Sequence, residues 1–198
     1  AAAVVVAGEQ VLVLGGWAGR PLATVEAYSM SSNTWSSRRS MMQGMSVPIT
    51  AVINNLVCVL FSDDPDNKPS QRGDEISLQL YNTQTDRWRY GAPLPGGMGR
   101  TWGARAVAVN DSMFVAGGLD SICAQYMLDT NQWIKLSPPN VMHHYGSLVL
   151  YNGDVFILGG QSRRKKDKDG KYMPDTVVEQ YDLKHDKWMV RSDMEMPV

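Results

Sequence analysis

The sequence predicts an all-β protein built from four repeated antiparallel sheets of four strands each. Three observations lead to this fold. A tyrosine and a tryptophan recur at one fixed spacing, and an apolar run that ends in two residues, usually glycines, recurs before each of these pairs. Only the interval from the end of that run to the tyrosine varies widely in length. Repeats of this kind, roughly 40 to 55 residues long, are typical of a β-propeller with one blade per repeat. The predicted blades span about residues 2–44, 45–96, 97–138 and 139–194.

The tyrosine and the tryptophan stand seven positions apart in every repeat. The residues between them are rich in Ser, Thr, Asn and Asp, which favour tight turns, so each phrase is expected to form the outer hairpin of a blade. We expect these aromatic side chains to pack between blades rather than to form a binding site. The pairs are Tyr28 and Trp35, Tyr81 and Trp88, Tyr126 and Trp133, and Tyr181 and Trp188.

The apolar run is expected to be the second strand of each blade. It ends in a glycine pair at 15–16, 117–118 and 159–160, and in Phe61 and Ser62 in the second repeat. Glycine has no β-carbon, so the backbone can pass close to a neighbouring segment with unusual dihedral angles. The segment after the pair varies in length and is expected to be a solvent-facing loop, and the long polar loop of the second repeat is expected to be mobile. The stretch AAAVVV at 1–6 is expected to be an inner strand.

Composition narrows the classes of function. The chain has 198 residues, 43% of them hydrophobic, and the repeats fill it as one domain from 1 to 198. A net charge of −1 argues against nucleic acid and anionic membrane as partners. Neither a membrane span nor a signal peptide is visible. Two cysteines, Cys58 and Cys123, are expected to be buried and reduced, which favours a cytoplasmic protein.

The phased glycine, tyrosine and tryptophan pairs resemble those of the kelch family over almost the whole chain. The resemblance implies a kelch-type β-propeller. Kelch proteins usually close a ring of six blades, so four repeats leave three interpretations: a closed four-bladed propeller, a segment of a larger ring, or an open arc completed by another copy. We favour the segment of a larger, typically six-bladed ring, because the spacing between tryptophan and glycine pair is that of ordinary kelch repeats.

Within that family the chain looks most like the kelch domain of BTB-kelch proteins, adaptors that present a bound protein to a cullin ubiquitin ligase. The BTB part that would bind the cullin is absent from these residues. An actin-binding kelch protein is the alternative. A galactose-oxidase-like enzyme is disfavoured. The sequence has only three histidines as candidate copper ligands, and it contains neither a G-x-S-x-G motif nor a phosphate loop. We therefore predict no enzyme activity and no cofactor.

The expected binding surface follows from strand order. If the strands of a blade are called a to d from the axis outward, the b–c loops and the d–a links emerge on the same face, where rigid scaffolds commonly carry recognition loops. Arginine and aromatic side chains gathered there suit a protein partner or an acidic peptide, because a guanidinium pairs with a carboxylate as a planar fork. The candidate contacts are Trp17, Arg20, Arg38, Arg39, Arg72, Arg100, Trp102, His143, His144, Tyr145 and Arg163.

Two further motifs lie in the last long loop. RRKK at 163–166 fits a nuclear import signal or an RNA contact, but Asp167 and Asp169 dilute its charge and favour a solvated loop. DKDGK at 167–171 has the start of a calcium loop but not the remaining ligands, so it is interpreted as a solvated turn.

Overall fold

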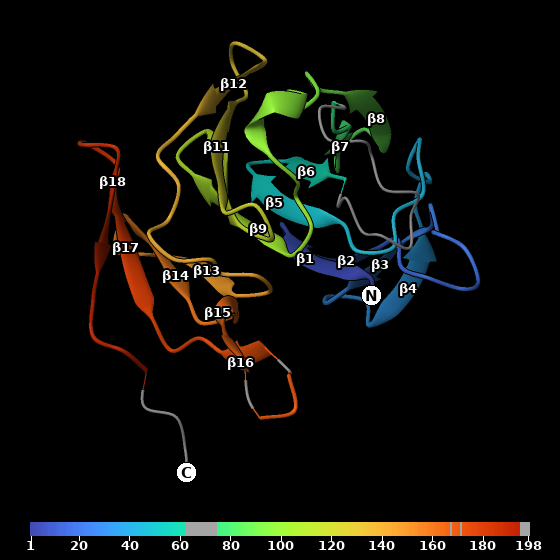
Figure 1. Ribbon diagram of the computed structural model, residues 1–198. Helices are drawn as coiled ribbons and strands as arrows, with labels where there is room; N and C mark the ends of the chain where they lie inside the picture. Colours follow the sequence, from blue (N-terminus) through green and yellow to red (C-terminus); the bar gives the residue numbers. More distant parts are fainter. Residues whose placement is uncertain (62–74, 167, 171, 195–198) are drawn as a thin grey trace.

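Four four-stranded antiparallel sheets, here called blades 1 to 4, stand side by side in an arc (Figure 1). The structure is a computed structural model and describes residues 1–61, 75–166, 168–170 and 172–194. Blades 1, 2 and 3 are formed by β1–β4, β5–β8 and β9–β12, and blade 4 by β13, β14, β17 and β18. The strands are β1 (Ala3–Ala7), β2 (Gln10–Leu14), β3 (Val25–Ser29), β4 (Thr34–Ser37), β5 (Ile49–Ile53), β6 (Leu56–Leu60), β7 (Leu78–Asn82), β8 (Arg87–Tyr90), β9 (Ala104–Val109), β10 (Ser112–Gly117), β11 (Ile122–Met127), β12 (Gln132–Lys135), β13 (Ser147–Tyr151), β14 (Asp154–Leu158), β17 (Val178–Asp182) and β18 (Lys187–Val190).

The all-β architecture and the four blades are confirmed. The stretch at 1–6 supplies an inner strand as predicted, since β1 begins at Ala3 and pairs with β2. Apart from the short 3₁₀ helix η2 (Gly96–Met98), every element in the described residues is a strand. None of the helical structure described is long and apolar enough to cross a bilayer.

Each Tyr–Trp phrase forms the outer hairpin of its blade, as the spacing predicts. The tyrosine and the tryptophan face each other directly across the two outer strands in all four blades. Their ring centroids lie 5.3, 4.8, 5.3 and 4.9 Å apart in blades 1 to 4. In blades 2 to 4 the tyrosine is at most 1% exposed, whereas Trp35 in blade 1 is 59% exposed.

The outer hairpin of blade 2 binds the backbone N–H and the backbone carbonyl of one residue that follows blade 1, Arg39. The indole Nε1 of Trp88 donates to the carbonyl oxygen of Arg39 at 2.7 Å, and the N–H of Arg39 donates to Asp86 Oδ1 at 2.9 Å. The hydroxyl of Tyr81 donates to the same Asp86 oxygen at 2.7 Å, which fixes the carboxylate. We call this arrangement of tyrosine, Asp or Asn, and tryptophan the clamp.

The clamp recurs at the next two interfaces with the same spacing. In blade 3, Asn131 and Trp133 bind the two backbone groups of Ala92 at 2.8 and 2.9 Å. In blade 4, Asp186 and Trp188 bind those of Ser137, both at 2.8 Å. The gripped residue always follows the tryptophan of its own blade by four positions. The hairpin is therefore fixed in length because it connects blades, not only because it turns.

The glycine pairs lie where backbone segments nearly touch. Gly15 has φ of 66°, and a β-carbon built there would lie 2.5 Å from the carbonyl oxygen of Met45, in the link that leads to blade 2. The N–H of Gly16 donates to that same carbonyl at 2.8 Å. The predicted role of the glycines, close backbone approach in an unusual conformation, is confirmed at this position.

Apolar side chains fill the three blade interfaces. Leu12 and Leu14 of blade 1 share a cluster with Val57 and Tyr81 of blade 2, and separate clusters join blade 2 to 3 and blade 3 to 4. The inner strands pack in the order β1, β5, β9 and β13. Cys58 and Cys123 are buried free thiols, as predicted, and burial raises the pKa of Cys58 to about 12.

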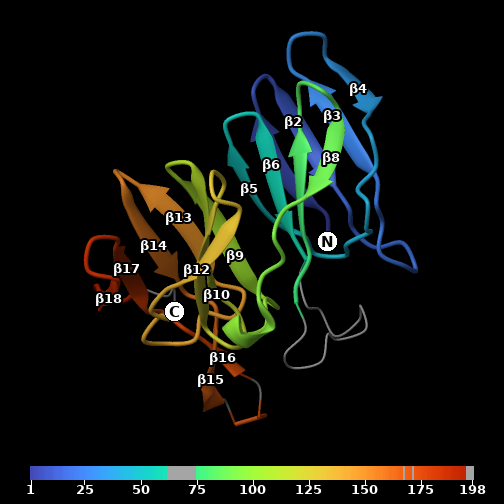
Figure 2. The same cartoon turned by 90° about the horizontal axis from the view of Figure 1, so that it is seen from above.

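The last long loop differs from the prediction. Instead of an irregular segment it contains a hairpin of β15 (Gln161–Lys166) and β16 (Tyr172–Pro174), which projects from blade 4 (Figure 2). RRKK at 163–166 therefore lies on a strand. Residues 62–74 of the long loop in the second repeat lie outside the described residues, as do 167 and 171 of DKDGK.

Candidate functional site

The b–c loops and the ends of the d–a links meet at one end of the blades, which we call the rim. In blade 1, Leu22 of the b–c loop forms a bridge with Met45 of the next link. In blade 4, Gln161 forms a bridge with His144 of the link before β13. In blade 3, Asp120 of the b–c loop accepts hydrogen bonds from the Arg100 side chain in the link before β9. All three contacts join the two kinds of connection.

Four side chains gather at the rim between blades 3 and 4. The ring centroid of His144 lies 4.8 Å from that of Trp102 and 4.2 Å from that of Tyr145. The guanidinium carbon of Arg105 lies 5.8 Å from the centre of the Tyr145 ring. We call Trp102, Arg105, His144 and Tyr145 the rim cluster. Its geometry depends on Gly103, where a β-carbon would lie 2.3 Å from the His144 ring.

Arg105 supplies the charge of the rim cluster. It is half-buried at the start of inner strand β9, and its Nη1 donates to the carbonyl of Ala104 at 3.0 Å. Burial lowers the pKa of its guanidinium, and the neighbouring Tyr145 opposes that shift. A guanidinium remains charged at neutral pH even after such a shift. A partly desolvated guanidinium beside an aromatic ring is suited to bind a carboxylate.

Arg105 was not predicted from the sequence as a binding residue. The predicted residues lie in loops and links, whereas Arg105 lies in the alternating strand ARAVAV. The signal was a charged residue in a strand of the inner ring, where the other blades carry small or apolar residues.

Four candidates lie on the rim with part of their surface accessible. Trp17 is 50% exposed and Tyr145 is 43% exposed, Arg20 is exposed, and Trp102 is half-buried. The structure brings Trp102 and Tyr145 together in the rim cluster. Trp17 and Arg20 belong to the b–c loop of blade 1, two blades away. Arg100 also lies on the rim, and its guanidinium pairs with Asp120 at 3.3 Å.

Arg38 and Arg39 are not rim residues, so this part of the prediction is wrong. Arg39 is gripped by the blade 2 clamp beside the β7–β8 turn, and Arg38 donates to Gln10 at 3.2 Å. The reason is the path of the link after β4. It begins at the outer corner of the blade and reaches the rim only near Met45.

His143 is not available to a partner either. Its side chain is buried between blades 3 and 4, with Nδ1 2.7 Å from the carbonyl oxygen of Gly159 and Nε2 3.0 Å from Glu179 Oε2. His144 is 7% exposed and supports its two aromatic neighbours from below the surface. Adjacent residues of an extended link point to opposite sides, which places one ring in the interface and the other in the rim cluster.

Glu179 connects the link of blade 3 to blade 4. Its carboxylate is buried and accepts hydrogen bonds from the backbone N–H groups of Asn140 and Val141 and from the Asn140 amide, at 3.0, 3.2 and 2.5 Å. Burial acts to raise the pKa of this carboxyl group, but the hydrogen bonds from His143, Asn140 and Val141 outweigh it and lower the pKa below its ordinary 4.5. Gln79 has the same role in blade 2, accepting from Met42 at 2.7 Å.

Replacing Glu179 with glutamine is expected to cost about 1–3 kcal/mol of unfolding free energy at pH 7, because a charged acceptor of several hydrogen bonds is lost. Since the folded pKa is lowered, ionised Glu179 stabilises the wild type above about pH 4.5, and this contribution is lost as the pH falls through the lowered folded value. The variant should therefore lose stability less steeply in acid. Glu26→Gln, at the equivalent exposed position of blade 1, is the control and should change neither quantity. Denaturant unfolding between pH 3 and 7 tests both expectations, and equal effects of the two variants would contradict them.

Two candidates lie beyond what the structure describes. Arg72 falls within 62–74, outside the described residues. Arg163 lies on β15, and its side chain is not among those described. Both remain sequence-based predictions.

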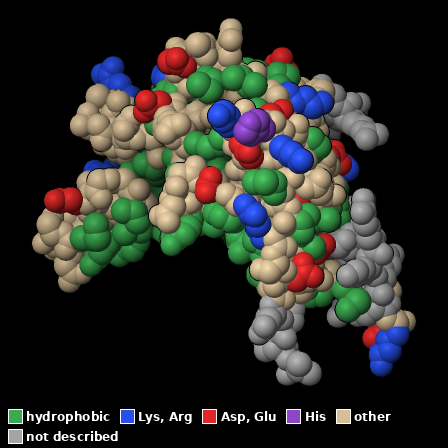
Figure 3. Space-filling model, turned by 90° about the vertical axis from the view of Figure 1, so that its left-hand side faces the viewer, with side chains coloured by type: hydrophobic (Ala, Val, Ile, Leu, Met, Phe, Trp, Pro, Cys, Tyr) green, Lys and Arg blue, Asp and Glu red, His purple; other side chains and the backbone are tan. Residues whose placement is uncertain are grey.

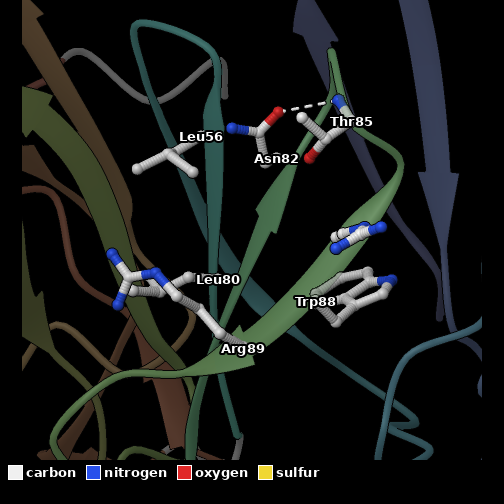
Figure 4. A pocket seen from close by; sticks show the side chains of 7 residues that line it. Leu56, Leu80, Asn82, Thr85, Trp88 and Arg89 are labelled. Atoms are coloured by element: carbon white, nitrogen blue, oxygen red, sulfur yellow. Dashed lines mark hydrogen bonds between the residues drawn. The ribbon is translucent and has the colours of Figure 1, made fainter.

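A pocket of about 400 Å³ opens at the other end of blade 2 (Figure 4). It is lined by Leu56, Leu80, Asn82, Thr85, Arg87, Trp88 and Arg89. Asn82 and Thr85 belong to the outer turn, where the Thr85 N–H donates to Asn82 Oδ1 at 2.9 Å. None of the lining residues is an acid, a histidine or a cysteine, so the pocket offers no general base or thiol nucleophile. Within the described residues, no three His, Cys, Asp or Glu side chains gather as a metal site.

Comparison with known proteins agrees with the blade geometry. The Kelch motif family matches residues 1–42 and 142–195. Kelch-like protein 23 of Homo sapiens is 24% identical over 186 residues, which cover 92% of this chain and 31% of the relative. Kelch-like protein 21 of Danio rerio is 29% identical over 92 residues, or 44% of this chain and 15% of the relative. The chain thus spans about a third or less of the curated relatives that it matches.

A solved structure shows the same fold over almost the whole chain. YjhT superposes with a TM-score of 0.74 at 12% identity, covering 99% of this chain and 66% of its own. The repeated glycine pairs and clamps, the two Kelch motif matches and the Kelch-like relatives together support a kelch-repeat family for this chain.

Proposed function

We propose that the chain is a non-enzymatic interaction module that holds a protein partner at the rim, with Arg105 pairing with a carboxylate of that partner. The observation that carries the proposal is the rim cluster. In this cluster Arg105, on the rigid inner strand β9, places its half-buried guanidinium beside the accessible ring of Tyr145. Interfaces gain most of their affinity from a few arginine and aromatic residues placed in this way.

The wider role that best fits is substrate recognition for a cullin-type ubiquitin ligase, as in BTB-kelch adaptors. Support comes from the Kelch-like relatives, of which this chain spans only a part. Cullin binding would belong to a BTB domain on the full-length protein. We rank this role above actin binding, because no feature of the rim in the described residues favours actin as the partner. We expect the protein to act in the cytoplasm.

The test of rim binding starts from peptides selected on the wild-type protein from an unbiased displayed library, and the selected peptides are expected to be acidic. Arg105→Ala is expected to weaken binding of the selected peptides about tenfold to a hundredfold, because a charge-assisted hydrogen bond contributes about 1.5–3 kcal/mol. Titration by fluorescence anisotropy measures the change, and the difference should shrink as salt is raised.

Arg87→Ala is the matched control for this test. Arg87 is an exposed arginine on β8, next to the outer turn and away from the rim. It should leave peptide affinity unchanged, and both variants should keep the unfolding midpoint of the wild type. Equal affinity of the wild type and Arg105→Ala, or a set of selected peptides without carboxylates, would refute rim recognition by Arg105.

A further inference from the structure

Tyr145 of the rim cluster is held in a backbone conformation that is unfavourable for its residue type. Its φ is 60°, in the left-handed region, where the β-carbon of an ordinary residue lies too close to the following carbonyl oxygen. The other non-glycine residues with positive φ in the described part of the chain are asparagines, aspartates and a serine. A bulky residue keeps such a conformation only where its surroundings fix it, and residues of this kind are common at binding sites.

The backbone around Tyr145 is held from both blades. The N–H of Tyr145 donates to the carbonyl of Gly103, in the link before β9, at 3.0 Å. The carbonyl of His144 accepts from the N–H of Gln161 in blade 4 at 2.8 Å. A β-carbon built at Gly146 would lie 2.9 Å from each of two carbonyl oxygens at the end of β14. These contacts on either side of Tyr145 leave its backbone little room to relax.

The side chain of His143 fixes the start of this stretch against blade 4. The residue is 1% exposed, and its ring lies between two oxygens: the carbonyl of Gly159 is 2.7 Å from Nδ1, and Oε2 of Glu179 is 3.0 Å from Nε2. Gly159 directly follows β14, and Glu179 lies on the neighbouring strand β17. One ring therefore ties the link to two strands of blade 4, two residues before Tyr145.

Both oxygens beside the His143 ring are acceptors. A backbone carbonyl has no proton to give, and Glu179 already accepts the N–H groups of Asn140 and Val141. Although burial acts against it, the hydrogen bonds keep the pKa of Glu179 below its ordinary value, so the carboxylate is ionised near pH 7. A neutral imidazole has one N–H and one lone pair, and it would turn that lone pair against one of the two oxygens in a buried site. The imidazolium donates from both nitrogens and satisfies both oxygens.

The charge that favours the imidazolium is local. Glu179 faces the ring from β17, the end of β14 presents a carbonyl, and Gly117 of β10 lies against the His143 β-carbon at 3.6 Å from its own built β-carbon. On the same link the titratable neighbours are His144 and Tyr145, whose rings pack on each other at the rim. Basic and acidic side chains are interspersed over the described surface on the side of blade 4 (Figure 3). The buried carboxylate, rather than an extended patch of one charge on that side, is therefore the partner of the ring.

We propose that His143 is held as an imidazolium near neutral pH, and that its two hydrogen bonds keep Tyr145 in its strained conformation within the rim cluster. His143 is a positioning residue, because it acts through Tyr145 and does not touch a partner itself. Its effect on peptide affinity rests on the proposed function of the rim, whereas its protonation and its hold on Tyr145 do not. The affinity of the rim is therefore full while the ring keeps both protons, and it weakens as the pH rises through the value at which the folded protein releases one of them.

Nitrogen-15 NMR of the histidine rings tests the protonation without any peptide. At about pH 7, both ring nitrogens of His143 are expected to show the chemical shifts of an imidazolium, and His143→Gln identifies these signals by removing them. Glu179→Gln removes the charged partner, so the ring should release its proton at a pH lower by about 1 unit or more. An unprotonated ring nitrogen on His143 at about pH 7 in the wild type would overturn the proposal.

The hold on Tyr145 is measured with His143→Gln, which carries its donors on one nitrogen and has no charge. At equal pH, hydrogen exchange of the Tyr145 N–H should be at least about tenfold faster in this variant than in the wild type. The affinity for the selected peptides should fall about threefold to thirtyfold, the size of effect typical of residues that act through others. Gln79→Ala is the matched control, because buried Gln79 holds the link after blade 1 through the N–H groups of Met42 and Gln43. It should destabilise the fold but change neither quantity, and equal effects of the two variants would refute a specific role of His143.

The pH profile of peptide affinity completes the test. Wild-type affinity should be at least about threefold weaker at about pH 9 than at about pH 6, and His143→Gln should abolish this difference. A pH dependence that survives in His143→Gln would assign it to His144 and overturn the proposal. Failure of the rim function gives a different pattern: Arg105→Ala would leave affinity unchanged, while the doubly protonated ring and the faster Tyr145 exchange in His143→Gln would still support the role of His143.

Discussion

Trp188→Ala is expected to lower the free energy of unfolding by about 3–5 kcal/mol, because it removes a large buried side chain and leaves a cavity. Trp188 is 4% exposed, packs at 4.9 Å from the Tyr181 ring, and donates to the carbonyl of Ser137 on blade 3. The loss should therefore include both interface packing and one half of the clamp. Denaturant unfolding followed by circular dichroism measures it.

Trp35→Ala is the matched control, since it removes the same side chain from the same position of blade 1. The Trp35 ring touches Tyr28 but is 59% exposed, so a loss of at most about 1 kcal/mol is expected. A similar loss for both variants would show that the hairpin pair itself, and not the contact between blades, carries the stability.

Gly15→Ala is expected to destabilise the protein by about 3 kcal/mol or more. The left-handed conformation at φ of 66° costs an alanine about 1–2 kcal/mol. The added β-carbon would also lie 2.5 Å from the carbonyl of Met45, and backbone on both sides must shift to accommodate it. The midpoint of thermal unfolding should fall accordingly.

Gly8→Ala separates the two causes. Gly8 has φ of 61°, and nothing lies within 4 Å of the position of its β-carbon. This variant should therefore show only the conformational cost of about 1–2 kcal/mol. If Gly8→Ala were as harmful as Gly15→Ala, close approach between the b–c end of blade 1 and the next link would not explain the glycine pair.

The fold was predictable because the same residues recur at the same spacing in each repeat. Tyr81 and Trp88 keep their distance in sequence because their hairpin both turns and holds a residue of the preceding blade. A glycine pair such as Gly15 and Gly16 stands where a blade passes close to a link. The hairpin β15–β16 was not predictable in the same way. A charged segment of one repeat has no copy elsewhere in the chain to show its conformation.

The candidate site was harder to predict, because different parts of one d–a link lie in different places, some in a clamp and some at the rim. Arg39 and Arg100 both follow the outer strand of a blade, yet one is held in a clamp and the other reaches the rim. His143 and His144 are adjacent, yet one is buried against Glu179 and the other lies in the rim cluster. Arg105 escaped notice because an inner strand was expected to supply only packing.

Recognition at the rim is tested most directly by hydrogen–deuterium exchange on the complex with a selected acidic peptide. Partner binding at the rim cluster predicts slowed exchange at residues 99–106 and 143–147, with no change at the outer turns 83–86 and 128–131. Protection confined to those outer turns, with residues 99–106 and 143–147 exchanging as in the free protein, would contradict it.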